Sequence, residues 1–158
     1  MKKMKNDNKG FTLVELIVVL VILAILAAIL IPALLGYIDE AKNKQLEIHG
    51  KSVYTAAQAV ASKNYAKNKA PKASTDGKIS ADANYVTDVK DLSEIATFGG
   101  SASATIYLSG DNDLKKLCTL KGIKYTENGI TIYMVTGSSE WVDTEPADLS
   151  GLPTVDIS

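Results

Sequence analysis

The hydrophobic and polar positions divide this chain into two parts. From Leu16 to Ile38 there are 23 consecutive residues without a charged side chain, and most of them are Ile, Leu, Val or Ala. At about 1.5 Å per residue a helix of this length reaches roughly 35 Å, more than the roughly 30 Å of a bilayer hydrocarbon core. The pattern therefore predicts a helix that can span a membrane.

The residues after this run predict that the same helix continues. Five apolar residues approximate one stripe at helical spacing: Ile38, Ala41, Ile48, Ala56 and Val60. Gly50 weakens the helix by about 1 kcal/mol, and Pro71 ends the pattern at the latest. We expect one helix from near Phe11 to near Ala66, with its second half packed under a sheet.

The remainder of the chain predicts short elements. Residues 67–85 are rich in Lys, Ala, Ser, Asn, Asp and Gly, a composition typical of a surface connection. The elements expected after it are a helix over 88–97, a strand over 104–108, a helix over 110–122 that ends at a Gly, a hairpin over 123–136, a further strand over 140–142 and a polar tail along the sheet edge. Asn128-Gly129 supplies the positive φ angles of the hairpin turn. This order indicates an α+β fold, with a small antiparallel sheet packed on the outer half of the long helix.

Composition excludes several classes of function. The chain has 17 basic and 18 acidic residues, a formal charge of -1, and every basic residue is Lys. Without Arg to make bidentate contacts, nucleic acid is not expected as a primary partner. The single cysteine, Cys118, cannot form an internal disulfide. With one histidine, His49, the chain also has no four-ligand zinc site of Cys and His.

No catalytic constellation emerges from the sequence, so we expect neither an enzyme nor a bound cofactor or metal. The cluster Asp111-Asn112-Asp113 has two interpretations, a helix cap or a calcium loop. Capping is favoured because Gly122 stands where a calcium loop needs its bidentate Glu. Cys118 is expected to be a buried structural thiol rather than a reactive one, and His49 is expected at the edge of the core.

The N-terminus admits three interpretations: a removable secretory signal, a permanent anchor, or a segment used after processing. Residues 1–10 carry four Lys and one Asp, which keeps this end in the cytoplasm by the positive-inside tendency. A secretory signal has an apolar core of about 7 to 15 residues. The apolar run here is longer, which disfavours that interpretation.

Glu15 separates the two remaining interpretations. A carboxylate on a membrane helix is costly and is a functional candidate, and Lys9 is six positions away, off the helical spacing that would pair them. If the chain were cut after Gly10, the new amine on Phe11 would carry a positive charge near neutral pH. That amine could pair with Glu15 of the same copy or of a neighbouring copy. The alternative is an interfacial Glu without a role.

The string KGFTLVE, followed by about twenty apolar residues, resembles the type III signal of type IV prepilins and pseudopilins. A short basic leader, a Gly, an aromatic residue and a Glu at the fifth position after that Gly occur together. The resemblance implies that a membrane-embedded prepilin peptidase and methyltransferase cleaves between Gly10 and Phe11 and N-methylates Phe11. It further implies three regions: a leader (1–10), an apolar transmembrane and polymerisation helix (11–36) and a pilin globular domain (37–158).

The resemblance also implies where the subunit is located before and after assembly. It would span the membrane with its N-terminus in the cytoplasm, and then pass through the membrane platform of a pilus assembly machine into an extracellular helical homopolymer. Such filaments serve adhesion, motility or biofilm formation. Glu15 would contact the N-terminal amine of an adjacent subunit, and the helix would kink or unwind near Pro32 and Gly36. No Gly occurs between Leu16 and Leu35, where many relatives carry one, so the extent of unwinding stays open.

Other members of the same machinery fit this N-terminus too. A pseudopilin or minor pilin of a type II secretion or DNA-uptake apparatus has the same signal, and a major pilin is favoured by the lack of a recognisable calcium loop. A membrane-anchored extracellular binding domain, with residues 67–85 as its site, is the alternative of another class. Lys usage and the lack of a disulfide favour a Gram-positive or anaerobic source. Removal of the leader leaves 13 Lys and 17 acidic residues, a charge of -4, so strong nucleic-acid binding by the filament is not expected.

Overall fold

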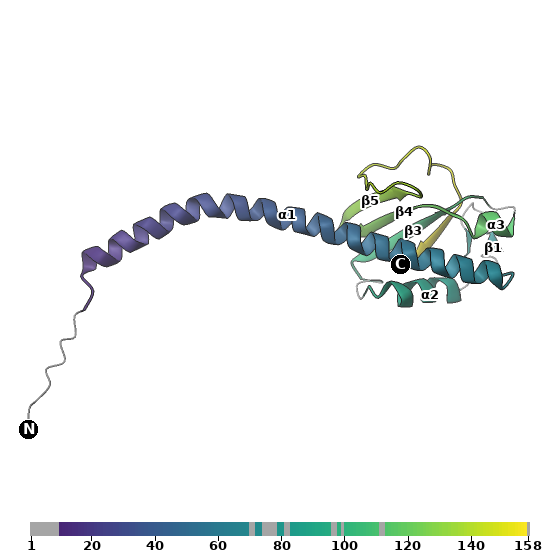
Figure 1. Cartoon of the computed structure of the whole chain (residues 1–158), viewed down its shortest axis with the longest axis horizontal. Helices are drawn as coiled ribbons and strands as arrows, with labels where there is room; N and C mark the ends of the chain where they lie inside the picture. Colours follow the sequence, from purple (N-terminus) through teal and green to yellow (C-terminus); the bar gives the residue numbers. More distant parts are fainter. Residues whose placement is uncertain are drawn as a thin grey trace, which may run out of the picture. The chain divides into compact units, whose positions relative to one another are not determined.

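The structure is a computed structural model, which describes residues 10–69, 72–73, 79–80, 83–95, 98, 100–110 and 113–157. The chain divides into two compact units, Met1–Lys42 and Asn43–Ser158. Helix α1 (Leu13–Ala66) has 54 residues, supplies the whole helical part of the first unit and continues into the second (Figure 1). The predicted long helix from near Phe11 to near Ala66 is confirmed.

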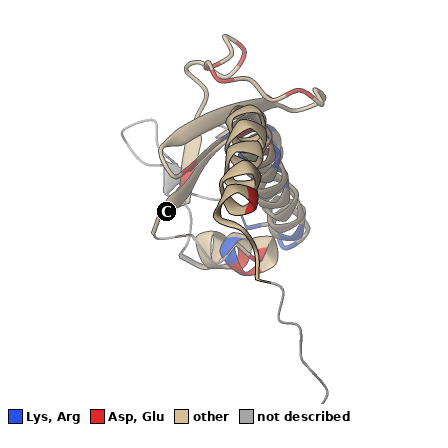
Figure 2. Ribbon diagram, turned by 90° about the vertical axis from the view of Figure 1, so that its left-hand side faces the viewer, with Lys and Arg blue, Asp and Glu red and all other residues tan. Residues whose placement is uncertain are grey.

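The first unit exposes its apolar side chains. Every large apolar residue of α1 from Leu13 to Ile38 is at least 41% exposed. The stretch is long and apolar enough to cross a membrane. Figure 2 shows this part of α1 in tan, because residues 16–38 contain no Lys, Asp or Glu. The sequence predicts a helix able to span a membrane, and the structure has a helix that is long enough and has an apolar surface.

The second unit is built on a four-stranded antiparallel sheet with strand order β5-β4-β3-β6. Its elements are β1 (Lys72–Ala73), β2 (Ile79–Ser80), α2 (Ala83–Ser93), β3 (Ala102–Leu108), α3 (Leu114–Leu117), β4 (Leu120–Glu127), β5 (Ile130–Val135) and β6 (Thr154–Ile157). β1 pairs with β2 in a separate two-stranded sheet. The predicted α+β layout is confirmed (Figure 1).

The core of the second unit lies between the sheet and the second half of α1. The helix buries residues spaced by four and three positions, the repeat that keeps side chains on one helical face: Leu46, Gly50, Val53, Ala57 and Val60. The strands supply alternate residues, among them Ile106, Leu108, Ile123, Tyr125, Val155 and Ile157. Tyr85 and Val89 of α2, one helical turn apart, complete this core.

The predicted apolar stripe of α1 is wrong over its first half. Ile48 is 66% exposed and Ile38 is 41% exposed, whereas Leu46 is buried. Both faces of the helix carry apolar residues here, so periodicity alone does not select between them. The sheet selects the face of Leu46 and Gly50, and it leaves Ile48 uncovered.

The predicted hairpin is confirmed. β4 and β5 are joined by Asn128 and Gly129, whose φ angles are 52° and 82°, as the predicted type I′ turn requires. The predicted strand over 104–108 lies within β3. The strand expected over 140–142 is reduced to a single bridge, in which Tyr133 and Val142 exchange two backbone hydrogen bonds of 2.8 and 3.0 Å.

Two predicted helices have other bounds. The helix expected over 88–97 is α2, which begins at Ala83 and ends where Glu94 adopts a left-handed φ of 55°. The surface connection expected over 67–85 therefore ends earlier, and it contains β1 and β2. The helix expected over 110–122 is the single turn α3, and Gly122 lies inside β4 opposite Val135. A Cβ at Gly122 would lie 2.5 Å from the carbonyl oxygen of Met134 and 2.6 Å from Leu149 Cδ2, so close packing requires this glycine.

The C-terminal tail is held without a disulfide. Leu149 is fully buried against Gly122, and β6 pairs with β3 at the sheet edge. The Tyr107 hydroxyl donates a 3.0 Å hydrogen bond to Glu145 Oε1. Burial, together with this carboxylate, raises the pKa of Tyr107 far above its usual value, so the hydroxyl stays protonated and remains a donor. Packing and hydrogen bonds thus hold the tail of a chain whose single cysteine cannot form an internal disulfide.

Candidate processing and assembly site

The predicted cleavage site lies just before helix α1. Gly10, Phe11 and Thr12 are not helical, and the helix begins at Leu13. The Phe11 side chain is 90% exposed, and a Cβ on Gly10 would meet no atom within 4 Å. The bond between Gly10 and Phe11 is therefore accessible, and none of the described residues packs closely enough to require a glycine here. The other residues of the predicted leader lie outside the described residues.

Thr12 and Glu15 form a reciprocal cap on the start of α1. The backbone nitrogen of Thr12 donates to Glu15 Oε2 at 2.9 Å, and the Thr12 hydroxyl donates to the same oxygen at 2.7 Å. The backbone nitrogen of Glu15 donates to the Thr12 hydroxyl oxygen at 3.2 Å. These contacts satisfy backbone donors that have no partner in the first helical turn. Glu15 therefore has a structural role within its own chain.

Sequence reasoning missed this cap, although its signal is local. Thr12-Leu13-Val14-Glu15 matches the capping-box pattern of Ser or Thr followed three residues later by Glu or Gln. The cap uses the nitrogen of Thr12 rather than that of Phe11, so cleavage after Gly10 would leave its atoms in place.

The Glu15 carboxylate can accept further hydrogen bonds in addition to those from Thr12. Both Thr12 bonds end on Oε2, and an ionised carboxylate offers about four acceptor positions on its two oxygens. Residues 10–41 contain no Lys, Arg or His, so the side chains of this segment provide no cation for it. An amine created at Phe11 by cleavage would be the only positive charge within residues 11–41.

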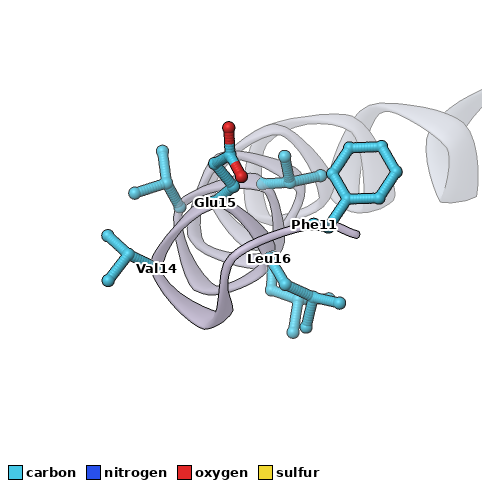
Figure 3. Close-up of a pocket in the computed structure, with 7 residues that line it drawn as sticks. Phe11, Val14, Glu15 and Leu16 are labelled. Atoms are coloured by element: carbon cyan, nitrogen blue, oxygen red, sulfur yellow. The ribbon is translucent and has the colours of Figure 1, made fainter. Parts of the chain in front are cut away.

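Apolar side chains surround this carboxylate. A hollow of about 570 Å³ runs along the first turns of α1 and is lined by Phe11, Val14, Glu15, Leu16, Val18, Val19 and Leu20. Figure 3 shows the Phe11 ring, the Glu15 carboxylate and the side chains of Val14 and Leu16 pointing away from the helix in different directions. Apolar surface of this kind is stabilised when it is removed from water. This surface, with the Glu15 carboxylate as its single charge, can therefore be covered by lipid or by another apolar helix.

Residues 5–31 match the family model described as the prokaryotic N-terminal methylation motif. The chain carries the N-terminal signature of type IV pilins and pseudopilins. This match and the long apolar helix confirm the resemblance drawn from KGFTLVE, and the signature includes Gly10, Phe11 and Glu15. Searches of curated proteins and of solved structures gave no match.

Two further residues of the prepilin-like segment were expected to loosen the helix. Pro32 and Gly36 both lie inside α1, which is helical from Leu13 onward without interruption. Pro32 lacks the N–H that would bond to the preceding turn, and a Cβ on Gly36 would meet no atom within 4 Å. Unwinding at these positions in a filament stays a prediction.

The remaining candidates from the sequence lie in the second unit and serve its structure. His49 Nδ1 lies 2.8 Å from Glu127 Oε2, and the same buried oxygen accepts a 3.0 Å hydrogen bond from the Tyr125 hydroxyl. Burial and this bond raise the pKa of Tyr125, which therefore stays a donor. The expectation that His49 sits at the core edge is met, with a buried partner that lies 78 positions away in the sequence.

The metal and thiol candidates have structural surroundings as well. Asp113 is the N-cap of α3 and accepts a 3.4 Å hydrogen bond from the Lys115 nitrogen, while residues 111 and 112 lie outside the described residues. Within the described ranges no three His, Cys, Asp or Glu side chains gather closely enough to hold a metal. Cys118 is half-buried against the core, and burial raises the pKa of its thiol, so it is a weaker nucleophile than an exposed cysteine.

Proposed function

We propose that this chain is the major structural subunit of a type IV pilus rather than an enzyme. A prepilin peptidase and methyltransferase would cleave it after Gly10 and methylate the amine of Phe11. The mature chain would then polymerise through the apolar half of α1 into a filament on the cell surface. One observation carries the proposal: a methylation motif at residues 5–31 lies on a helix whose apolar side chains are left uncovered.

The apolar half of α1 would have two successive surroundings. Before assembly the Lys-rich leader and the apolar helix hold the subunit in the membrane with its N-terminus in the cytoplasm. Cleavage removes four Lys and one Asp and creates the Phe11 amine. The membrane platform of the assembly machine then transfers the helix from lipid to other copies, whose apolar side chains cover the same surface.

Glu15 would set the register of the polymer. In the isolated chain its carboxylate caps α1 through Thr12. The methylated amine of a neighbouring copy would supply the cation that the segment itself lacks. A carboxylate and an amine between apolar helices are each costly when unpaired, so pairing disfavours every register that separates them. Helix packing would supply most of the cohesion.

Two alternatives predict a different location or a different N-terminus. A pseudopilin or minor pilin has the same motif, and its mature chain would stay with the membranes or form a small share of the fibres. A membrane-anchored binding domain would keep residues 1–10. The N-terminus and the location of the mature chain therefore separate these alternatives from a major pilin.

Substitution of Glu15 tests the assembly role in cells that express the full chain. Glu15→Ala is expected to insert into the membrane at the wild-type level but to be greatly depleted from sheared filaments. Glu15→Gln is the matched variant, because its amide oxygen can still accept the Thr12 bonds while its negative charge is gone. We expect Glu15→Gln to be depleted as well, and filaments at wild-type yield from both variants would contradict the proposal.

Thr12→Ala separates capping from pairing. It removes the hydroxyl, but it keeps the Glu15 charge and the backbone donor at 2.9 Å. If Glu15 acts chiefly on a neighbouring copy, Thr12→Ala filaments should be far more abundant than Glu15→Ala filaments. Equal depletion of the two variants would instead assign Glu15 to the cap alone.

A further inference from the structure

The charged residues of the second unit are segregated along the chain. Residues 43–72 contain six Lys and one acidic residue, Glu47, whereas residues 125–158 contain six acidic residues and no Lys. The surface of a small soluble domain usually mixes charges of both signs. This unit therefore has a basic region on α1 and just after it, and an acidic region towards its C-terminus.

The acidic region is held firmly to the sheet while its carboxylates stay exposed. Val142 exchanges two backbone hydrogen bonds with Tyr133 of β5, at 2.8 and 3.0 Å, and Leu149 is fully buried. The Tyr107 hydroxyl donates to Glu145 at 3.0 Å. We call residues 140–148 the acidic strap, whose four exposed acidic residues are Glu140, Asp143, Glu145 and Asp148.

The end of the acidic strap lies on the face of the sheet opposite α1. Leu149, directly after the strap, packs on Gly122 of β4. The next residue, Ile123, belongs to the core that the sheet shares with α1. Because successive residues of a strand point to opposite faces, Gly122 and Leu149 lie on the other face. In Figure 1 the segment that follows β5 lies apart from the last turns of α1.

Two lysines mark the point where α1 ends. The helix ends at Ala66, Asn68 has a left-handed φ of 56°, and the Lys69 nitrogen donates to the Asn64 carbonyl at 2.9 Å. We call Lys67 and Lys69 the lysine end. Both are exposed, and neither has an ion pair with any other residue that the structure describes. A helix C-terminus favours such positive charges and leaves them accessible to a partner.

The signs of the charges select which surfaces of two copies can meet. Two acidic straps repel each other, and so do two lysine ends, whereas a strap attracts a lysine end. The two surfaces lie apart on one copy, so each is left for another copy to pair with. A contact between two different surfaces leaves one of each unused at the ends of the assembly. When repeated, it gives a ring or an open helical filament.

We propose that the acidic strap of one copy binds the lysine end of a second copy, in a head-to-tail contact between their globular units. The inference rests on the proposed function, because a filament holds copies close enough for exposed ion pairs to form. Exposed ion pairs contribute little cohesion. The contact would therefore orient neighbouring globular units, and helix packing would hold the filament together.

A carbodiimide tests the contact in filaments sheared from cells that express the full chain, because it joins a lysine to a carboxylate only when the two touch. We expect an adduct of two copies in which mass spectrometry locates an amide between the lysine end and the acidic strap. Lys63 and Asp88, 2.8 Å apart within one copy, are the internal control. Their amide should form in filaments and in the unassembled chain in detergent, whereas the adduct of two copies should form only in filaments.

Exchange of the charges gives a second readout. Lys67→Glu with Lys69→Glu should lower the amount of this adduct by roughly tenfold or more, because like charges then face each other. Adding Glu140→Lys, Asp143→Lys and Asp148→Lys to the same chain should restore an adduct between the two surfaces. Lys51→Glu is the matched control, because Lys51 is also exposed on α1 but lies about 24 Å before Lys67 along the helix. It should leave the adduct unchanged.

The outcomes separate this inference from the proposed function. Filaments in which Lys63 and Asp88 are joined, but in which the strap is joined to no lysine, to other lysines or to another protein, would overturn the contact alone. A charge exchange that does not restore the adduct would also contradict it. Absence of the wild-type chain from every filament would overturn both the contact and the proposed function.

Discussion

The two units of this chain differ in how much of their apolar side chains is exposed. In Asn43–Ser158 the core residues Ile106, Ile123 and Tyr125 are fully buried. From Leu13 to Ile38 no large apolar side chain is less than 41% exposed. Because burial of apolar surface is the dominant favourable term in folding, the second unit is stabilised by its own contacts. The first unit needs lipid or other copies to cover it. Folding of the second unit and the proposed assembly thus depend on separate stretches of one chain.

The largest expected difference between the two units comes from an Ile→Ala substitution made once in each of them. Ile123→Ala should lower the free energy of unfolding of the second unit by about 2 to 5 kcal/mol, because it leaves a cavity in a packed core. Ile22→Ala should leave that free energy unchanged, since Ile22 contributes nothing to this core. Denaturant unfolding of the full chain in detergent, followed by the fluorescence of the single tryptophan, Trp141, measures both. Equal losses from the two variants would contradict the separation.

Two glycines, one in each unit, differ in how closely other atoms pack against them. Gly122→Ala should destabilise the second unit by about 3 kcal/mol, because the added methyl group meets the Met134 carbonyl and Leu149. A Cβ on Gly36 would lie within 4 Å of no described residue outside the adjoining turns of its own helix, so Gly36→Ala should not change the unfolding of the second unit. The same fluorescence measurement applies. A stable Gly122→Ala variant would show that Leu149 and the tail adapt more easily than the close packing indicates.

The contact between His49 and Glu127 is a polar link within the second unit. His49→Ala should cost about 1 to 2 kcal/mol, because it removes one hydrogen-bond partner from a buried carboxylate. His49→Gln keeps a side-chain donor and should recover part of that loss. Unfolding midpoints of the two variants measure the difference. No loss in His49→Ala would mean that the other partners of Glu127 satisfy the carboxylate.

The smallest expected effect concerns Cys118. Burial raises the pKa of its thiol, so at pH 8 it has a smaller thiolate fraction than an unstructured cysteine, and alkylation should be slower. The reaction should speed up when the second unit is unfolded in denaturant. Quantifying the alkylated chain by intact mass over time measures both rates. An equal rate in the folded and unfolded chain would show that the thiol is not protected by the core.

The features predicted correctly from the sequence have local signals. An uncharged run of 23 residues specifies the apolar helix, and KGFTLVE specifies the processing motif. Asn128-Gly129 specifies the hairpin, because few other residue pairs adopt two positive φ angles so readily. The cap of Thr12 and Glu15 has an equally local signal and was predictable, although it was missed.

The features that were mispredicted depend on distant residues. Gly122 was expected to end a helix, but Leu149, 27 positions later, and β5 determine that it lies in a strand. Ile48 and Leu46 are equally apolar, and only the position of the sheet decides which of them is buried. The partner of His49 lies 78 positions away. Contacts of this kind are set by tertiary packing, which overrides local propensity.

The central claim is that this chain is processed after Gly10 and assembled through α1. The intact mass and N-terminal sequence of the chain in fibres sheared from its native cells, compared with the same analysis of membranes, test it most directly. We expect the chain in the sheared fibres to begin with methylated Phe11. A chain that begins with Met1 in both fractions, with no methylated Phe11 start in either, would contradict it and would favour an anchored domain.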